Sequence, residues 1–359
     1  NNDFYQYLID RFNGSTTNSA IINKKIELMY GKGLTIKNAH THADNYAKLL
    51  KMFPKRELRK IISDFELFGS ASFFIRKNKG GGISDCYHIP RQTLAPEKMN
   101  EDGEIEAYYY CKNWKNTQKN KPERIPFFGR GGKTETEVMV VEPYRAGKFY
   151  FADPKYLAGC QYAQLEEEIS NFSINHIKNG LSAGYIINFN QGAPTTVEQA
   201  DEIERDIKRK LTSSGNAGNV IISFNENKEN QPTIEEIPTN KSHEAWQLWV
   251  DLARTNIMVS HGVTSPILFG IKDNSGLGNN ADELRTAFEL YMNTELKPNQ
   301  EILLDAFQEV AYKADVSQEI EFVQMVLVSN DMREETQLSS EKKNVVDNDD
   351  KVATFLLEL

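Results

Sequence analysis

Two histidines and an aspartate, His40, His42 and Asp44, have the spacing of a metal-binding motif. Two neutral imidazoles in such a pair can hold a divalent ion, and a metal-dependent hydrolase uses that ion in its reaction. The motif should follow a buried strand at the mouth of a barrel, but here it lies in a polar connector between helical segments, with no alternating strands and helices downstream. We therefore expect a surface loop without metal. A metal-dependent hydrolase using the His40/His42 pair remains the alternative function.

A glycine-rich segment, residues 129–134, reads Gly-Arg-Gly-Gly-Lys-Thr and ends like a phosphate-binding loop. In that loop the first glycine allows the backbone to turn around the phosphates, and here Phe127 stands in its place. The sequence therefore does not support an ATPase.

Three consecutive glutamates, Glu166 to Glu168, could suggest catalytic carboxylates. Consecutive helix positions point in different directions, so at most one of them could face a given site. We interpret them as an acidic band that is solvated or faces another subunit. Trp246 and Trp249 could stack on nucleic acid bases, but packing between neighbouring helices explains them more simply.

A small basic cluster, Lys208, Arg209 and Lys210, ends a predicted helix. Cations there complement the helix dipole, or they could contact DNA or a docking partner. We expect no catalytic residue and no cofactor.

The charge differs between the two parts of the 359-residue chain. Residues 1–150 hold 25 Lys and Arg against 17 Asp and Glu, a net of +8, whereas residues 151–359 hold 17 against 34, a net of −17. An acidic half cannot hold DNA phosphates over a broad face, because that requires clustered Lys and Arg. A DNA-binding regulator is therefore disfavoured.

The three cysteines lie far apart without a Cys-x-x-Cys spacing, which favours reduced thiols over disulfides or a zinc site. No apolar stretch approaches the roughly 18 to 20 residues of a membrane span, and the first residues do not resemble a signal peptide. We expect no membrane association and a location in the cytoplasm.

Hydrophobic spacing predicts helices in the first 62 residues and then a change to strands. The second part is mostly helical, with one small α/β insert between two long helices. We predict helices over 2–30, 46–62, 157–179, 197–211, 243–259 and 282–313, the last kinked at Pro298, and strands over 71–76, 105–110, 135–141, 185–189 and 220–224.

This order of elements resembles the portal protein of tailed bacteriophages over residues 60–312. The segments that carry the resemblance are Phe-Glu-Leu-Phe-Gly-Ser-Ala-Ser-Phe at 65–73, Asp-Pro-Lys-Tyr at 153–156, Ile-Lys-Asn-Gly at 177–180, and His-Gly-Val-Thr-Ser-Pro-Ile-Leu-Phe-Gly at 261–270 with the Gly/Asn-rich loop after it.

The resemblance implies an α+β fold with a mixed α/β wing, two long stem helices that bracket a small α/β clip, and a long kinked wing helix after a tunnel loop. A large helical crown at the C-terminus is expected to be missing or truncated. The implied division is 1–156 wing, 157–183 first stem helix, 184–240 clip, 241–262 second stem helix, 263–280 tunnel loop region, 281–330 long wing helix and return strand, and 331–359 an acidic segment expected to be mobile.

The resemblance also implies a function without enzymatic activity. A portal is a ring, expected to be dodecameric, at one capsid vertex of the virion, and it forms in the host cytoplasm during assembly. Its implied partners are further copies of itself, the terminase large subunit, a head-completion or adaptor protein, the major capsid or scaffolding protein, and the double-stranded DNA that passes through the channel.

Three groups of residues follow as candidate sites. The DNA-channel loop would use Lys272, Asp273, Asn274 and Ser275. Lys208, Arg209 and Lys210 would form the basic cluster of the clip. The subunit interface would use Leu165, Ile169, Phe172, Trp246, Trp249 and Leu252.

Overall fold

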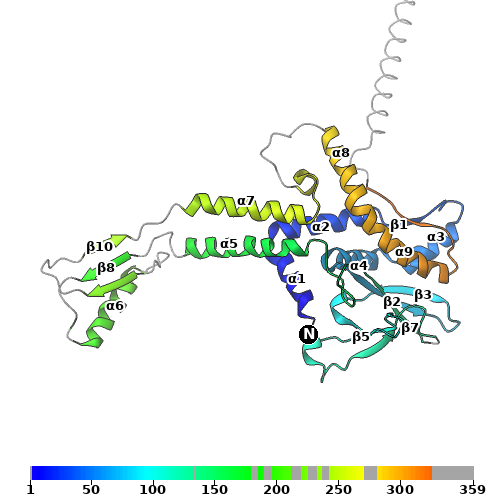
Figure 1. The fold of residues 1–359 in the computed structure, drawn as a ribbon, viewed down its shortest axis with the longest axis horizontal. Coiled ribbons are helices and arrows are strands. Elements are labelled where there is room, and N and C mark those ends of the chain that lie inside the picture. The colour runs from blue at the N-terminus through cyan, green and yellow to red at the C-terminus, as the bar shows by residue number, and fades with distance from the viewer. Residues whose placement is uncertain are drawn as a thin grey trace, which may run out of the picture.

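The computed structural model shows a body of helices and sheets from which two long helices lead away to a separate small sheet (Figure 1). It describes residues 2–132, 134–178, 185–189, 194, 196–211, 220–224, 233–236, 242–270 and 281–325.

Four helices open the chain, in the two regions where the spacing of apolar residues predicts them. They are α1 (Asp3–Gly14), α2 (Thr16–Tyr30), α3 (Ala43–Met52) and α4 (Lys55–Phe68). The side chain of Ser15 caps α2 by accepting a hydrogen bond from the backbone N–H of Asn18 at 3.1 Å. At the end of α4, Gly69 has φ +72°, and a Cβ there would lie 2.5 Å from the carbonyl carbon of Asp153, so a glycine is required.

Two three-stranded antiparallel sheets follow α4. The first has the order β3-β2-β7, and the second has the order β4-β5-β6. The strands are β2 (Ala71–Lys77), β3 (Ile83–His88), β4 (Leu94–Pro96), β5 (Ala107–Tyr110), β6 (Glu123–Pro126) and β7 (Thr136–Val141), with short 3-10 turns η1 (Arg91–Thr93) and η2 (Trp114–Asn116). The three predicted strands correspond to β2, β5 and β7.

The core of the body joins segments from both ends of the chain. The ring of Phe53 lies 5.8 Å from that of Phe73 on β2 and 4.7 Å from that of Phe307 on the last helix, and all three are buried. A short strand, β1 (Leu34–Ile36), pairs antiparallel with β11 (Ile320–Phe322). Segments almost 300 residues apart in sequence therefore close one body.

The two long helices are antiparallel neighbours with the small sheet at their far end (Figure 1). In that sheet β8 pairs parallel with β9 and antiparallel with β10. The elements are η3 (Leu157–Gly159), α5 (Cys160–Lys178), β8 (Tyr185–Phe189), α6 (Val197–Leu211), β9 (Val220–Phe224), β10 (Thr233–Glu236) and α7 (Ser242–Ser260). Of these, β10 is not among the strands predicted from the sequence.

The last helical stretch is interrupted near Pro298, as predicted. It consists of η4 (Pro266–Phe269), α8 (Ala281–Tyr291), a π-helical turn η5 (Met292–Leu296) and α9 (Lys297–Lys313). Proline has no N–H to donate and crowds the carbonyl four residues earlier, which is that of Thr294 in the π-helical turn. The fold class is the predicted mixture of helices and sheets. No helix in the described part of the chain is both long and apolar enough to cross a bilayer.

Candidate subunit interface and its attachment to the body

The hairpin of α5 and α7 is fixed to the body through α1 and α2. Both carboxylate oxygens of Glu166 on α5 accept hydrogen bonds from the start of α2. Oε1 accepts from the side chain of Thr17 at 2.7 Å, and Oε2 accepts from the side chain of Ser15 and from the backbone N–H of Thr17 at 3.2 Å. Glu167 forms an ion pair with Arg11 at 3.1 Å. The carboxylate of Glu166 thus accepts hydrogen bonds from donors at the N-terminus of α2 that have no partner within that helix, and negative charge is favourable at this position.

The interpretation of the three glutamates as one acidic band is therefore wrong for Glu166 and Glu167. Both side chains bind other helices of the same chain, whereas Glu168 is exposed. The helical spacing correctly places these residues away from the apolar stripe, but it carries no information about which other helix meets them.

A buried aromatic contact holds the base of the hairpin, where the chain enters α5 and leaves α7. The ring of His261 stacks on that of Tyr156 at 4.5 Å, and the Tyr156 hydroxyl donates to the carbonyl of Leu67 at 2.6 Å. Asn18 uses its amide N–H for the carbonyl of Arg11, so its oxygen accepts from Nε2 of His261 at 2.8 Å. Burial, with a smaller contribution from Lys25, lowers the pKa of His261 well below its ordinary value, and the imidazole is neutral.

An ion pair lies in the core next to this contact. Nζ of Lys25 on α2 is 2.9 Å from a carboxylate oxygen of Glu66 on α4, and the two side chains are 4% and 2% exposed. The second oxygen accepts from the Asn299 amide of α9 at 3.3 Å. Burial raises the pKa of Tyr156 and Tyr291, and the negative charge of Glu66 adds to both shifts. The ion pair and the Asn299 amide together link α2, α4 and α9.

The six residues of the candidate interface divide into an inner and an outer group. The ring of Phe172 lies 4.1 Å from that of Trp246, so α5 and α7 contact each other there. Leu165, Ile169 and Trp246 are half-buried. Phe172, Trp249 and Leu252 remain 49%, 46% and 46% exposed.

The outer face of the hairpin includes further apolar residues that the sequence analysis missed. Leu248 and Val259 on α7 are 66% and 71% exposed, and Ile174 on α5 is 49% exposed. A second apolar stripe on α7, beside the one that meets α5, is the sequence signal that could have identified them. An apolar surface of this extent is typical of a site that contacts protein.

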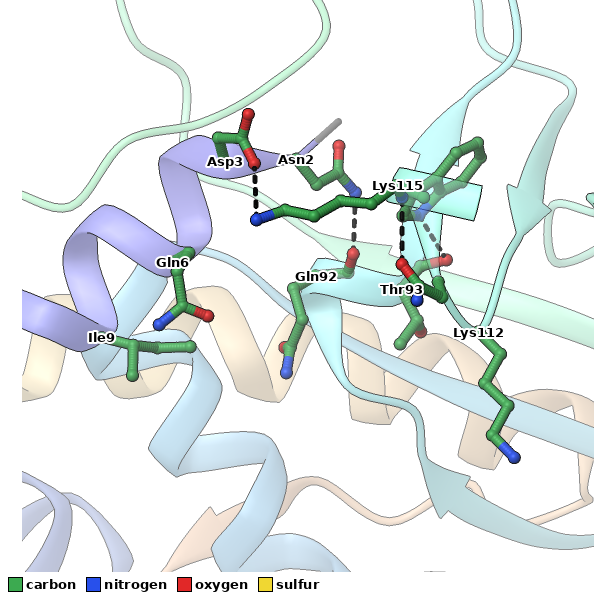
Figure 2. Close-up of a pocket in the computed structure, with 10 residues that line it drawn as sticks. Asn2, Asp3, Gln6, Ile9, Gln92, Thr93, Lys112 and Lys115 are labelled. Atoms are coloured by element: carbon green, nitrogen blue, oxygen red, sulfur yellow. Dashed lines mark hydrogen bonds and ion pairs between the residues drawn. The ribbon is translucent and has the colours of Figure 1, made fainter. Parts of the chain in front are cut away.

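A polar pocket of about 220 Å³ lies at the start of α1, where η1 and η2 meet it (Figure 2). Asn2 donates to the carbonyl of Gln92 at 2.7 Å, and Trp114 donates to that of Thr93 at 3.1 Å. Asp3 is the single carboxylate among the described lining residues, and it lies 3.6 Å from Nζ of Lys115. The lining offers hydrogen bonds but no pairing of a nucleophile with a base.

The other candidates from the sequence lie elsewhere. His40 and His42 are in an exposed turn before α3, and among the described residues no group of three or more His, Cys, Asp or Glu could hold a metal ion. In the glycine-rich segment, the N–H groups of Gly129 and Gly131 donate to the Glu137 carboxylate at 3.2 and 2.8 Å. That loop thus binds a carboxylate of its own chain.

Two candidate groups lie outside what the structure describes. The channel-loop residues Lys272, Asp273, Asn274 and Ser275 are not among the described residues. Lys208, Arg209 and Lys210 fall in α6, but their side chains are likewise outside the described part.

Comparison with known proteins identifies the fold. No family model and no curated protein matches the chain. Among solved structures, the chain is similar to a protein in the neck of a native GTA particle computed with C12 symmetry, with 14% identity, a TM-score of 0.61, and coverage of 93% of this chain and 87% of that one. An HK97-family phage portal protein from Corynebacterium diphtheriae has 10% identity, a TM-score of 0.53, and coverage of 86% and 92%.

A protein of the virion of a native gene transfer agent particle is also similar, with 14% identity, a TM-score of 0.60, and coverage of 94% and 89%. The chain therefore has the fold of a phage portal protein over most of its length. The resemblance predicted from the sequence is confirmed at the level of the fold.

Proposed function

We propose that the chain is a portal subunit that assembles into a ring at one vertex of a phage capsid. The observation that carries this proposal is the exposed apolar face of the α5–α7 hairpin, with Phe172, Trp249 and Leu252 on its outside. Aromatic residues are enriched at the cores of protein interfaces. A face of one copy that contacts a different face of the next copy generates a closed ring when the rotation closes. The expected ring is dodecameric.

In this ring α5 and α7 are the stem helices and the sheet of β8, β9 and β10 with α6 is the clip. The clip docks the terminase large subunit and a head-completion or adaptor protein, with Lys208, Arg209 and Lys210 available for a docking partner or DNA. The wing contacts the major capsid or scaffolding protein. The ring acts in the virion and assembles in the host cytoplasm.

Double-stranded DNA passes through the centre of the ring during packaging and ejection. Residues 151–359 are strongly acidic, and a like-charged channel wall does not retain the phosphate backbone. The loop 271–280 is the tunnel loop, and Lys272 and Asp273 leave it with no net charge. The subunit is not an enzyme in this proposal, because it only positions DNA and partners.

The test is ring formation by the purified protein. Trp249→Glu should give monomers or broken rings in sedimentation velocity and native mass spectrometry, because a charge replaces an apolar contact in every subunit interface. Loss of a central aromatic contact of this kind typically costs at least about 2 kcal/mol of binding free energy. Tyr312→Glu is the matched control, since Tyr312 is 57% exposed on α9, away from the hairpin.

Circular dichroism should show both variants to be as helical as the parent. Intact rings of Trp249→Glu would contradict the proposed interface. Stoichiometric zinc or manganese in the purified protein would instead favour the metal-dependent hydrolase with His40 and His42.

A further inference from the structure

The corner between α3 and α4 carries a dense group of exposed cations. Residues 43–60 contain six Lys and Arg against two Asp and Glu. We define the basic corner as its five exposed members, Lys48, Lys51, Lys55, Arg56 and Arg59. Positions three apart share one side of a helix, which puts Lys48 with Lys51 on α3 and Arg56 with Arg59 on α4.

These charges are largely uncompensated within the described part of the chain. The carboxylate of Glu57 lies 2.7 Å from Nζ of Lys60, which is outside the basic corner. The guanidinium of Arg59 lies over the ring of Tyr30, 3.9 Å from its centre. None of the corner's lysines, nor Arg56, forms an ion pair with another described residue. Neighbouring like charges repel, so an anionic partner would stabilise this surface.

The basic corner offers charge with little apolar surface. Four large apolar side chains of the same segment, Leu49, Met52, Phe53 and Leu58, are buried, and Tyr46 and Leu50 are half-buried. A stable protein interface needs an apolar or aromatic core and is depleted in lysine. A surface that binds nucleic acid phosphates needs clustered Lys and Arg and no apolar core. The composition of the corner thus favours a nucleic acid backbone over a protein.

The corner is also held rigidly. Phe53, the residue at the bend between the two helices, lies in the core between Phe73 and Phe307. Its N–H donates to the carbonyl of Leu49 at 2.9 Å, which closes the last turn of α3. The backbone that carries the cations therefore has little freedom to lose on binding.

We propose that the basic corner binds the phosphate backbone of double-stranded DNA without regard to sequence. Figure 1 shows α3 at the end of the body farthest from β8 and β10, so this site is separate from the proposed stem and clip. In the proposed ring, that end is directed away from the terminase-docking clip, so it contacts packaged DNA and not DNA in transit. Binding itself requires only the folded body and does not depend on ring formation.

The test measures DNA binding by the purified full chain. Binding of a short labelled duplex of mixed sequence is monitored by fluorescence anisotropy at KCl concentrations from about 50 to 200 mM. Affinity falls as salt rises, and each lost phosphate contact makes the negative slope of log affinity against log salt concentration shallower by about 0.9. The variant Lys48→Gln/Lys51→Gln/Lys55→Gln should therefore make this slope less negative by about 2.7. Replacing the same three lysines by arginine should preserve it.

The matched control is Lys112→Gln/Lys119→Gln/Lys121→Gln, which removes the same charge from exposed lysines of the β5–β6 connection. Residues 111–122 of this connection hold four Lys and no Asp or Glu, so the control also removes charge from a basic segment, one that lies outside the basic corner. The control should keep the parent's slope. Equal loss in both variants would show a net-charge effect and overturn the proposal, as would an unchanged slope in the corner variant. Tighter binding of polyglutamate than of the duplex would favour an acidic protein partner and would also refute it.

Discussion

Lys25→Met removes the cation of the buried Lys25–Glu66 pair and leaves a carboxylate that is 2% exposed without its ion-pair partner. The Asn299 amide still donates to one oxygen at 3.3 Å, but the oxygen that is 2.9 Å from Nζ loses that contact. Breaking one side of a buried pair costs about 3–5 kcal/mol, because the remaining charge stays buried. At about 2–4 °C per kcal/mol, the melting midpoint of the body should fall by roughly 10 °C.

The double variant Lys25→Met/Glu66→Met separates the pair's net contribution from the cost of leaving one charge behind. Replacing both charges of a buried pair by apolar residues is often neutral, or stabilising by about 1–4 kcal/mol. We therefore expect the second substitution to recover most or all of the stability that the first one loses. Lys24→Met is the control, since the neighbouring Lys24 is 40% exposed and its pair with Glu27 contributes at most about 0.5 kcal/mol.

The assay is urea and thermal unfolding monitored by circular dichroism, at one pH and salt concentration, for five proteins: the parent, Lys25→Met, Glu66→Met, the double variant and Lys24→Met. The reasoning fails if Lys25→Met lies within about 1 kcal/mol of the parent. It also fails if the double variant loses the sum of the two single losses, because independent sites add and coupled ones do not.

Two further predictions concern the attachment of the hairpin. Glu166→Ala should lower the free energy of unfolding by about 1–3 kcal/mol, because the N-terminus of α2 at Thr17 loses its hydrogen-bond acceptor. Glu168→Ala should change it by less than about 0.5 kcal/mol, and equal effects of the two variants would contradict the assigned contact. The depressed pKa of His261 means that the unfolded chain binds a proton that the folded chain excludes, so stability is complete above pH 6.5 and decreases as pH falls below it. His261→Gln should remove that part of the pH dependence, and an unchanged profile would assign it to other groups.

The sequence predicted the elements with strong periodicity and missed those that depend on distant partners. The helices at 157–179 and 243–259 and the strand at 71–76 carry repeats of 3.6 or 2 residues over enough length to be read directly. The strand pair Leu34–Ile36 and Ile320–Phe322 has three residues on each side, too few for alternation to be recognised, and neither strand forms without the other.

The candidate site was predictable in the same partial way. Apolar spacing identified Phe172 and Trp249, but it could not show that Trp246 is covered by α5 while Trp249 faces outward. That distinction depends on the crossing of two helices. The role of Glu166 depends likewise on the position of a third helix, α2, which is 150 residues earlier in the chain.

The pairing of β1 with β11 has a consequence for the order of events during synthesis. Domains generally fold as units while the chain emerges from the ribosome. Here the core around Phe53 and Phe73 lacks Phe307, and β1 lacks its partner, until almost the whole body has been translated. The hairpin of α5 and α7 emerges before the body that supports it can close. Nascent chains therefore present an apolar helical face before they have a finished fold, and an assembly that recruited subunits at that stage would incorporate incomplete ones.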